Sequence, residues 1–344
     1  ELWAQLEKDD ITLREACGNA VRNITASETA GIDVNEPFDV SPYAHATFQF
    51  FLRNAICQEM GRKFKISFSG TDDDTAISFM HDLGFIAKSK LIDGQRVKGF
   101  KVMLAGGLGS QPRHADVIYE FLEEQLLIPT IEGVLRVFDR YGERNKRAKA
   151  RLKFLVKEIG ISAFLELVAE EKQALAYEIF PIDASGFEQE IVFQENEIPE
   201  VIIEDTKGFE AWKNTNVIQQ KQDGLFAVGI KVSLGDFYTD KARLLADLVQ
   251  KYAANEIRLT LRQNILIRHV REELLPLFYV ELSKLGFTDL GYNSTSDITA
   301  CPGTDTCNLG ISSSTGIAVE LERILKEEYP AYINNKEVAI KISG

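Results

Sequence analysis

The stretch GLFAVGIKVS, residues 224–233, alternates its apolar side chains in the manner of a β-strand. A helical periodicity follows over 240–253, and EIRLTLRQNILIRHV at 256–270 is strand-like again. The next segment, ELLPLFYVELSKLGF, has its apolar residues on one side, as in an amphipathic helix. Strand, helix, strand and helix on this scale predict half of a ferredoxin-like unit.

The composition is that of a globular protein, because 45% of the 344 residues are hydrophobic and 26% are charged. No run of eighteen apolar residues and no secretory signal pattern is found, so we expect no membrane association. Four cysteines are too few for a disulfide scaffold and predict a reducing, cytoplasmic compartment. The net charge of −13 argues against nucleic-acid binding, because phosphate neutralisation needs a basic face.

Both ends of the sequence predict a chain cut from a longer protein. ELWAQLEKDD resembles the helix that closes the unit above, so it predicts the tail of an earlier copy, and EVAIKISG is strand-like up to a glycine. The predicted organisation has four parts: a remnant of a first half-repeat, a central α/β domain, a second half-repeat and the start of another domain. Their ranges are 1–10, 11–200, 201–290 and 291–344.

Within the central part, RKFKISFSG at 62–70 is a period-two strand, and GFKVMLAGGLGSQP at 99–112 is a second strand that ends in glycines. From 114 to about 177 the pattern is helical, with breaks expected near Pro129 and at Tyr141–Gly142. The acidic, polar segment at 187–200 predicts a linker to the half-repeat.

Lys63 and Lys65 fall on the same side of the 62–70 strand, opposite its phenylalanines. Like charges at roughly 7 Å repel unless an anion or solvent compensates. The pair therefore indicates either a solvated sheet face or the cationic wall of an anion site. Arg22, in REACGNAVRN, lies among small residues and by itself indicates an ordinary surface arginine.

Two further segments allow two interpretations each. AGGLG lacks the spacing of a dinucleotide fingerprint, so its glycines indicate a tight turn or, less favoured, close approach to a ligand. RYGERNKRAKARLK, residues 140–153, carries seven cations. A solvated helix face is the favoured interpretation, and a docking surface for an acidic electron donor is the alternative.

Cys301 and Cys307, in ACPGTDTCNLG, are separated by five residues. Zinc needs two more ligands, none of which is obvious nearby, and a disulfide is disfavoured in a reducing compartment. Half of an iron–sulfur site remains if two more cysteines come from elsewhere. Cys17 and Cys57 are isolated from each other and from this pair, so they are weak candidates.

Six segments in order resemble the siroheme-dependent sulfite and nitrite reductases, over essentially the whole chain. They are REACGNAVRN, GRKFKISFSG, KVMLAGGLGSQP, YGERNKRAKARLKFLV, RLTLRQNILI and ACPGTDTCNLG. The resemblance implies an α+β fold, with a pseudo-twofold pair of ferredoxin-like halves and mixed α/β domains that hold siroheme. Here that fold is expected to be incomplete at both termini. It also assigns siroheme and anion binding to 11–200, and cluster and siroheme binding to 291–344.

The same resemblance implies a [4Fe–4S] cluster joined to the siroheme iron by a cysteine thiolate. In the family, the cluster ligands are a C-x5-C pair followed by a C-x3-C pair. Cys301 and Cys307 match the first pair, and the second is expected beyond KISG. The cluster is therefore expected to be absent from the chain as it stands, which would then be inactive.

The resemblance also implies active-site roles by position. Arg22 matches an anion-binding arginine, and Lys63 and Lys65 match two active-site lysines that attract the anion and pass protons. Crowding by cations is expected to lower a lysine pKa toward the working range. The remaining matches concern siroheme and its carboxylates: they are Arg62, Gln263 and the loop residues Gly106 and Gly107.

The implied activity is the six-electron reduction of sulfite to sulfide in sulfur assimilation. Nitrite reductases of the family commonly have Asn at the position of Lys65, so the sequence favours sulfite over nitrite. The alternatives are nitrite reduction to ammonia by the same cofactors, or a non-catalytic apo fragment. The expected electron donor is a ferredoxin or a flavoprotein, and uncovered edges predict that the fragment self-associates.

Overall fold

The computed structural model describes residues 1–9, 11, 18–109, 111–187 and 191–344, and of Arg22 it describes the backbone alone. Two compact units are present, Glu1–Gln189 and Glu190–Gly344. Their boundary falls in the segment expected to be a linker, whereas the finer division into four parts stays a prediction. None of the helices in the described ranges has the length and apolar character needed to cross a membrane.

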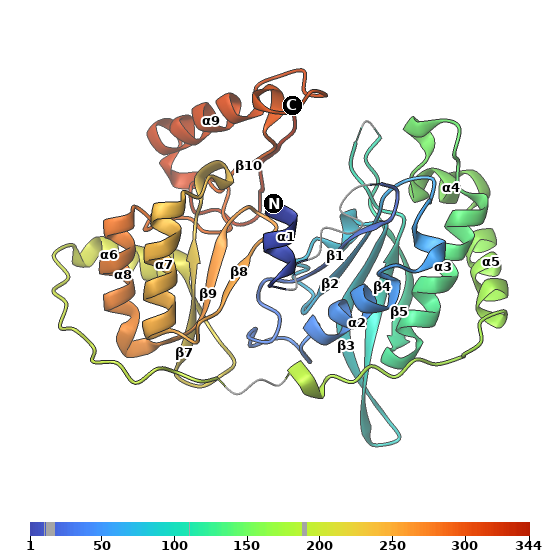
Figure 1. Cartoon of the computed structure of the whole chain (residues 1–344), viewed down its shortest axis with the longest axis horizontal. Helices are drawn as coiled ribbons and strands as arrows, with labels where there is room; N and C mark the ends of the chain where they lie inside the picture. Colours follow the sequence, from blue (N-terminus) through green and yellow to red (C-terminus); the bar gives the residue numbers. More distant parts are fainter. Residues whose placement is uncertain (10, 12–17, 110, 188–190) are drawn as a thin grey trace. The chain divides into compact units, whose positions relative to one another are not determined.

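The first unit is built on a five-stranded mixed sheet (Figure 1). The strands β1, β2 and β3 are parallel, and β4 and β5 complete the sheet in antiparallel fashion. In sheet order they are β1 (Val21–Ala26), β2 (Phe64–Ser69), β3 (Leu83–Ile92), β4 (Gln95–Leu104) and β5 (Asp116–Glu123).

Helices cover one face of this sheet. They are α2 (Ser41–Phe51), α3 (Leu127–Tyr141), α4 (Leu152–Ile159) and α5 (Ile161–Gln173). Phe64, Ile66 and Phe68 of β2 are fully buried in the core that these helices share with the sheet, as the alternation predicted. Since successive side chains of a strand point to opposite faces, Lys65 lies on the other face. The short helix α1 (Leu2–Glu7) lies on the surface of this unit.

The expectation of helix throughout 114–177 is wrong at its start. DVIYEFLE forms β5, because its backbone pairs with β4. Pro129 does not interrupt a helix either: it is the third residue of α3, where its missing N–H has no intrahelical partner to lose. The expected break after Tyr141 is confirmed, since α3 ends there.

The second unit carries the half-repeat, a four-stranded antiparallel sheet whose strands follow the order β6, β7, β9 and β8. Three helices bury their apolar sides against it; the periodicity predicted the last two of them, whereas the first was not predicted. The strands are β6 (Val217–Gln219), β7 (Leu225–Ile230), β8 (Ile257–Leu259) and β9 (Ile265–Arg271), and the helices are α6 (Thr206–Asn216), α7 (Thr239–Tyr252) and α8 (Leu275–Leu285).

The prediction of one strand over 256–270 is wrong, because the chain reverses there. Leu259 pairs with Ile265 across a turn that is closed by the Thr260 N–H donating to the Asn264 carbonyl at 2.9 Å. Gln263 takes a left-handed conformation in this turn, with φ of 65°. After the half-repeat, β10 (Thr299–Ala300) pairs in parallel with β11 (Lys341–Ile342), and α9 (Ser314–Glu328) lies between them in sequence.

Candidate functional site

The start of β2 lies beside β1, which carries Arg22, and comes shortly after Arg62. Asn23 is the register partner of Lys65, so the backbone of Arg22 lies beside the start of β2, while its side chain is outside the described part. Arg62 is close enough for its charge to act on Lys65. The structure thus groups Arg62 with Lys65 and leaves the orientation of Arg22 a prediction.

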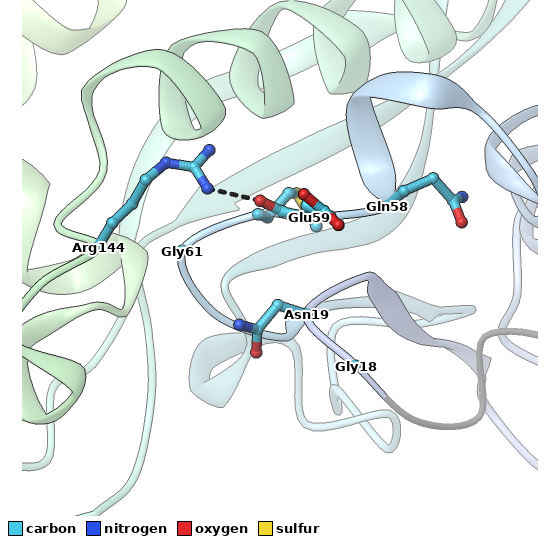
Figure 2. Close-up of a pocket in the computed structure, with 7 residues that line it drawn as sticks. Gly18, Asn19, Gln58, Glu59, Gly61 and Arg144 are labelled. Atoms are coloured by element: carbon cyan, nitrogen blue, oxygen red, sulfur yellow. Dashed lines mark hydrogen bonds between the residues drawn. The ribbon is translucent and has the colours of Figure 1, made fainter.

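A hollow of about 410 Å³ lies next to this segment (Figure 2). Arg144 closes one side of it, because its Nη1 donates to the Glu59 carbonyl at 2.5 Å while its Nη2 donates to the Asp139 carboxylate. Arg144 is thereby held against the residues that precede Arg62. The lining residues are Gly18, Asn19, Gln58, Glu59, Met60, Gly61 and Arg144.

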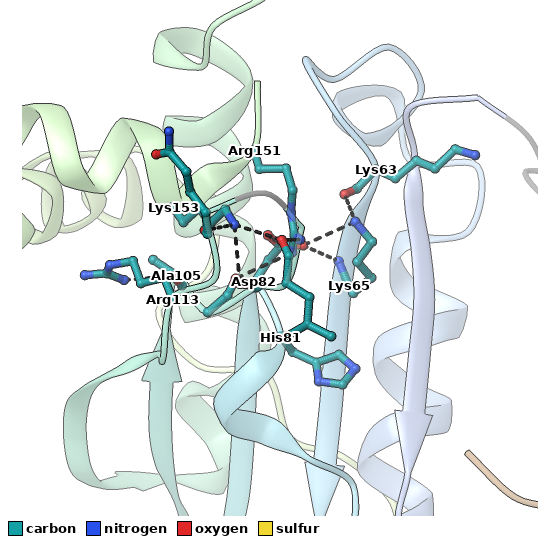
Figure 3. A network of polar contacts seen from close by, with 12 residues as sticks. Lys63, Lys65, His81, Asp82, Ala105, Arg113, Arg151 and Lys153 are labelled. Atoms are coloured by element: carbon teal, nitrogen blue, oxygen red, sulfur yellow. Dashed lines mark hydrogen bonds and ion pairs between the residues drawn. The ribbon is translucent and has the colours of Figure 1, made fainter. Parts of the chain in front are cut away.

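Lys65 is the predicted lysine that enters a polar cluster (Figure 3). Its backbone N–H donates to Asp82 Oδ2 at 3.1 Å, and its Nζ lies 3.6 Å from the same oxygen. The Nζ also donates to the Lys63 carbonyl at 2.6 Å. The Lys63 side chain itself points away from Asp82 (Figure 3). The two lysines therefore have different surroundings, although sequence placed them together.

The pKa of Lys65 is lowered from its ordinary value, and the first cause is burial, which disfavours the charged amine. Asp82 opposes this by favouring the ammonium, while Arg151 and Arg62 lower the pKa further. The expected crowding by cations is therefore present as a smaller contribution. An amine in this position is suited to release a proton more readily than an exposed lysine.

Asp82 and Arg151 join Lys65 to the glycine loop after β4. Asp82 is only 1% exposed, and its Oδ1 accepts a hydrogen bond from Arg151 Nη2 at 3.1 Å. The Nη1 of Arg151 donates to the Leu108 carbonyl at 3.2 Å. Lys153, which is 3% exposed, donates to the carbonyls of Leu108 at 2.8 Å and Gln111 at 2.5 Å. Burial lowers the pKa of Lys153, and Arg151 adds to the shift.

Gly106 and Gly107 are required by close packing within this cluster. A Cβ on Gly106 would lie 2.4 Å from the Phe79 carbonyl oxygen. A Cβ on Gly107 would lie 2.6 Å from the Arg151 guanidinium. Gly107 thus leaves room for the Arg151 guanidinium, and Gly106 for the Phe79 carbonyl. Neither interpretation of the sequence included these contacts. Their approach to siroheme stays a prediction.

The basic run at 140–153 does not form one solvated helix face, so that interpretation is wrong. Gly142 ends α3, the next residues form a loop, and α4 begins only at Leu152. Residues 144–149 are exposed, whereas Arg151 and Lys153 turn inward. Sequence reasoning missed these two, because it treated the seven cations of 140–153 as one run, and it also missed Asp82.

Cys301 directly follows β10 and is partly exposed, while Cys307 is exposed. The Sγ of Cys301 lies 3.4 Å from Ser314 Oγ and accepts the Gly344 N–H at 3.2 Å. Hydrogen bonding to Ser314, followed by that to the Gly344 and Gly303 N–H groups, lowers the pKa of Cys301 from 9.0 to about 7. The thiolate, which is the metal-binding form of cysteine, is therefore favoured here.

The side-chain amide of Gln263 is hydrogen-bonded to β10, the strand that directly precedes Cys301. Its Nε2 donates to the Ala300 carbonyl at 3.0 Å, and its Oε1 accepts the Ala300 N–H at 3.2 Å. The amide of Gln263 thus fixes the residue that immediately precedes Cys301. A direct contact with siroheme, which the resemblance implied, stays a prediction.

The residues present supply part of the binding sites for the cofactors that the resemblance implies. Thiolates are the usual ligands of iron–sulfur clusters, and Cys301 and Cys307 supply two of them. In the described ranges no group of three potential metal-ligating side chains gathers, so this is a partial set. Cys57 is fully buried, and Cys17 lies outside the described residues. In the first unit, Arg151 Nε is buried without a hydrogen-bond partner among the described groups, which suits a further anionic group.

Comparisons with known proteins identify the family to which this chain is similar. Residues 17–175 match the family profile "Nitrite and sulphite reductase 4Fe-4S domain", and residues 218–285 match "Nitrite/Sulfite reductase ferredoxin-like half domain". An assimilatory ferredoxin-dependent nitrite reductase of Haloferax mediterranei is 29% identical over 348 aligned residues, covering all of this chain and 57% of that protein. A sulfite reductase [ferredoxin] of Mycolicibacterium paratuberculosis is 27% identical over 95% of this chain and 55% of that protein.

A solved structure of the Mycobacterium tuberculosis NirA protein shares the fold. It aligns with a TM-score of 0.76 and 24% identity, over all of this chain and 58% of that one. The chain thus spans a little over half the length of the curated relatives that it matches. On these profiles and relatives, the chain belongs to the nitrite and sulfite reductase family, whose cofactors are siroheme and a [4Fe–4S] cluster.

Proposed function

We propose that the protein carrying this chain reduces sulfite to sulfide in sulfur assimilation, using siroheme and a [4Fe–4S] cluster. The observation that carries the proposal is the position of Lys65. Its amine is partly buried on the face of β2 opposite the helices, has a lowered pKa and lies beside Asp82 and Arg62. That combination of positive charge and a releasable proton suits an oxyanion that must be bound and protonated.

In this proposal, different residues of the chain bind the anion and supply protons to it. Lys65 holds a proton at Nζ for transfer to an oxygen of the anion, and Lys63 adds positive charge at the same strand. Arg22 supplies a permanently charged, fork-shaped donor. When bound, siroheme supplies the electron-transfer chemistry at its iron. Protons are needed because the oxygen of sulfite or nitrite leaves as water.

Cofactor binding is assigned to residues of both units. Cys301 and Cys307 are the proposed cluster ligands from this chain. Arg62 and the loop at 106–107 are proposed to contact siroheme. Gln263 is proposed to act on the cofactor site through Ala300, because its amide is already satisfied there.

The second candidate activity is reduction of nitrite to ammonia. It is favoured by the relative from Haloferax mediterranei, which matches the whole chain and is described as a nitrite reductase. Lys65 favours sulfite, because family nitrite reductases commonly have Asn there. Steady-state kcat/KM values for both anions, measured with the same reduced donor, decide between them. A higher value for sulfite supports the proposal, and a strong nitrite preference replaces it with the second candidate.

Ferredoxin is the proposed electron donor. The names of several relatives specify ferredoxin, and residues 144–149 expose four cations that an acidic donor can contact. Turnover with reduced ferredoxin should fall steeply with ionic strength. Equal turnover with a flavoprotein donor at all salt concentrations would contradict this.

An apo scaffold is the remaining alternative, and the absorbance of the purified chain tests it. A Soret-type band with the long-wavelength bands of an isobacteriochlorin shows that the chain holds siroheme. A colourless protein would support the apo alternative for the chain by itself. Size-exclusion chromatography of the same sample tests the proposed self-association.

A further inference from the structure

Asp82 is the buried carboxylate at the centre of the cluster in the first unit. It precedes β3 directly, is 1% exposed, and uses both carboxylate oxygens. Its Oδ2 accepts the Lys65 N–H at 3.1 Å, and its Oδ1 accepts Arg151 Nη2 at 3.1 Å (Figure 3). A charge buried this deeply must be paired and hydrogen-bonded to be tolerated. Asp82 therefore depends on both partners, and both partners depend on it.

The contacts of Asp82 connect three segments that are distant in sequence. Through the Lys65 N–H it fixes the start of β2, and through Arg151 it reaches the loop after β4. Arg151 in turn donates to the Leu108 carbonyl, and the missing Cβ of Gly107 leaves room for its guanidinium. A change at Asp82 thus alters the position of the Lys65 amine relative to the glycine loop.

We propose that Asp82 is a positioning residue for the reaction, which holds the Lys65 ammonium in place and couples it through Arg151 to the glycine loop. This inference rests on the proposed function of Lys65. Asp82 does not contact substrate in this role; it acts through Lys65. Its carboxylate also keeps the partly buried amine protonated, since an opposite charge nearby favours the charged form.

The groups that face Lys65 set the sign of each expected change. Burial lowers its pKa, Asp82 raises it, and Arg151 and Arg62 lower it. His81 is the neighbouring titratable group; burial lowers its pKa, so it is neutral near pH 7 and adds no charge. Removing the Asp82 charge must therefore lower the titration midpoint of Lys65, the pH at which half of its amine is deprotonated. Removing the Arg151 charge must raise this midpoint.

The test is competitive acylation of lysine amines with acetic anhydride over a range of pH, with the extent of labelling at Lys65 measured by mass spectrometry. In Asp82→Asn, the Lys65 midpoint is expected to fall by about one to three pH units. Asp82→Glu keeps the charge and should restore the midpoint toward that of the wild type. Asp116→Asn is the matched control, because Asp116 pairs with Arg113 in the same cluster and should leave Lys65 unchanged.

A second variant keeps the inference testable if Asp82→Asn does not fold. Arg151→Met removes the competing cation and should raise the Lys65 midpoint, the opposite sign to Asp82→Asn. A folded Asp82→Asn protein with an unchanged Lys65 midpoint, or a downward shift in Arg151→Met, would overturn the role of Asp82. Acylation reports on Lys65 without any turnover, so its outcomes do not depend on the proposed function. The proposed function fails by a different result, which is turnover at the wild-type rate in Lys65→Met.

Discussion

Gln263 holds Ala300 with both ends of its amide, donating from Nε2 at 3.0 Å and accepting at Oε1 at 3.2 Å. Ala300 is the last residue of β10, and Cys301 follows it directly. A side chain from the turn before β9 therefore sets the position of a predicted cluster ligand 38 residues further along the chain. Removing that amide is expected to loosen β10 before it affects the half-repeat sheet.

Substitution of Gln263 by Ala should accelerate hydrogen exchange at the Ala300 amide and lower the free energy of unfolding by about 2 kcal/mol, since two neutral hydrogen bonds are lost. Hydrogen–deuterium exchange with mass spectrometry and chemical denaturation measure the two effects. Gln250→Ala, at an exposed site on α7, is the matched control and should change neither. Unaltered protection at Ala300 in Gln263→Ala would contradict the role assigned to this amide.

Substitution of Gly107 by Ala should destabilise the first unit and displace Arg151 from Asp82. The new Cβ would lie 2.6 Å from the guanidinium, closer than atoms tolerate. Gly109→Ala is the control: Gly109 also has a positive φ, of 102°, but nothing lies within 4 Å of its Cβ position. Both variants carry backbone strain of about 1 kcal/mol.

Thermal denaturation of the two glycine variants distinguishes backbone strain from the steric clash with Arg151. The expected result is a clearly lower Tm for Gly107→Ala than for Gly109→Ala. Equal decreases in Tm would show that backbone strain alone accounts for the effect of both substitutions. The position of Arg151 would then not depend on the absence of a side chain at residue 107.

Glu322→Gln should be costly at neutral pH, because Glu322 pairs with the buried Lys231. Burial opposes ionisation of Glu322, but the hydrogen bond and charge of Lys231 lower its pKa below the ordinary value of 4.5. A lowered carboxylate pKa stabilises the fold above that ordinary value and loses the effect as pH falls through the folded-state pKa. The expected cost is about 3–5 kcal/mol near pH 7, shrinking toward acid.

Urea denaturation of Glu322→Gln and wild type at several pH values checks this dependence. Glu320→Gln on the same helix is the control, because its pair with Arg323 is exposed to solvent and is expected to contribute little to stability. A cost for Glu322→Gln that does not vary between pH 7 and pH 3 would rule out the ion pair as its source.

Cys301→Ser should abolish cluster binding, because serine does not replace the soft thiolate that iron–sulfur clusters require. Iron and acid-labile sulfide, assayed in the purified enzyme, are expected to fall to background. Cys57→Ala, in the core of the first unit, should keep the cluster if the protein folds. Retention of iron and sulfide in Cys301→Ser would remove Cys301 from the ligand set.

The parts of the fold that sequence predicted are those decided by local periodicity. β2 and the half-repeat follow from alternation or helical spacing within a few residues, and both are present. β5 was missed because DVIYEFLE runs directly into the turn before α3, and only its pairing with β4 decides its conformation. The turn within 256–270 was missed because its residues are polar and apolar in nearly strand-like alternation.

The sequence predicted several residues of the candidate site, but it did not predict the hydrogen bonds that connect them. Lys65, Arg62 and Cys301 were named from the family resemblance, and their roles stay predictions. The hydrogen bond between Arg151 and Asp82 joins residues 69 apart in sequence, and the one between Gln263 and Ala300 joins residues 37 apart. Pairings at such separations depend on the packed sheet and leave no periodic trace in the chain.

Turnover of Lys65→Met, made in the protein that carries this chain, tests the central claim most directly. Sulfite and nitrite reduction should be measured at saturating donor, with bound siroheme quantified by absorbance, and with Lys90→Met on the exposed end of β3 as the matched control. The account predicts that turnover falls by about 100-fold or more while siroheme stays bound, because a positioned proton donor contributes at least that much. Turnover equal to that of Lys90→Met, with siroheme bound, would contradict it.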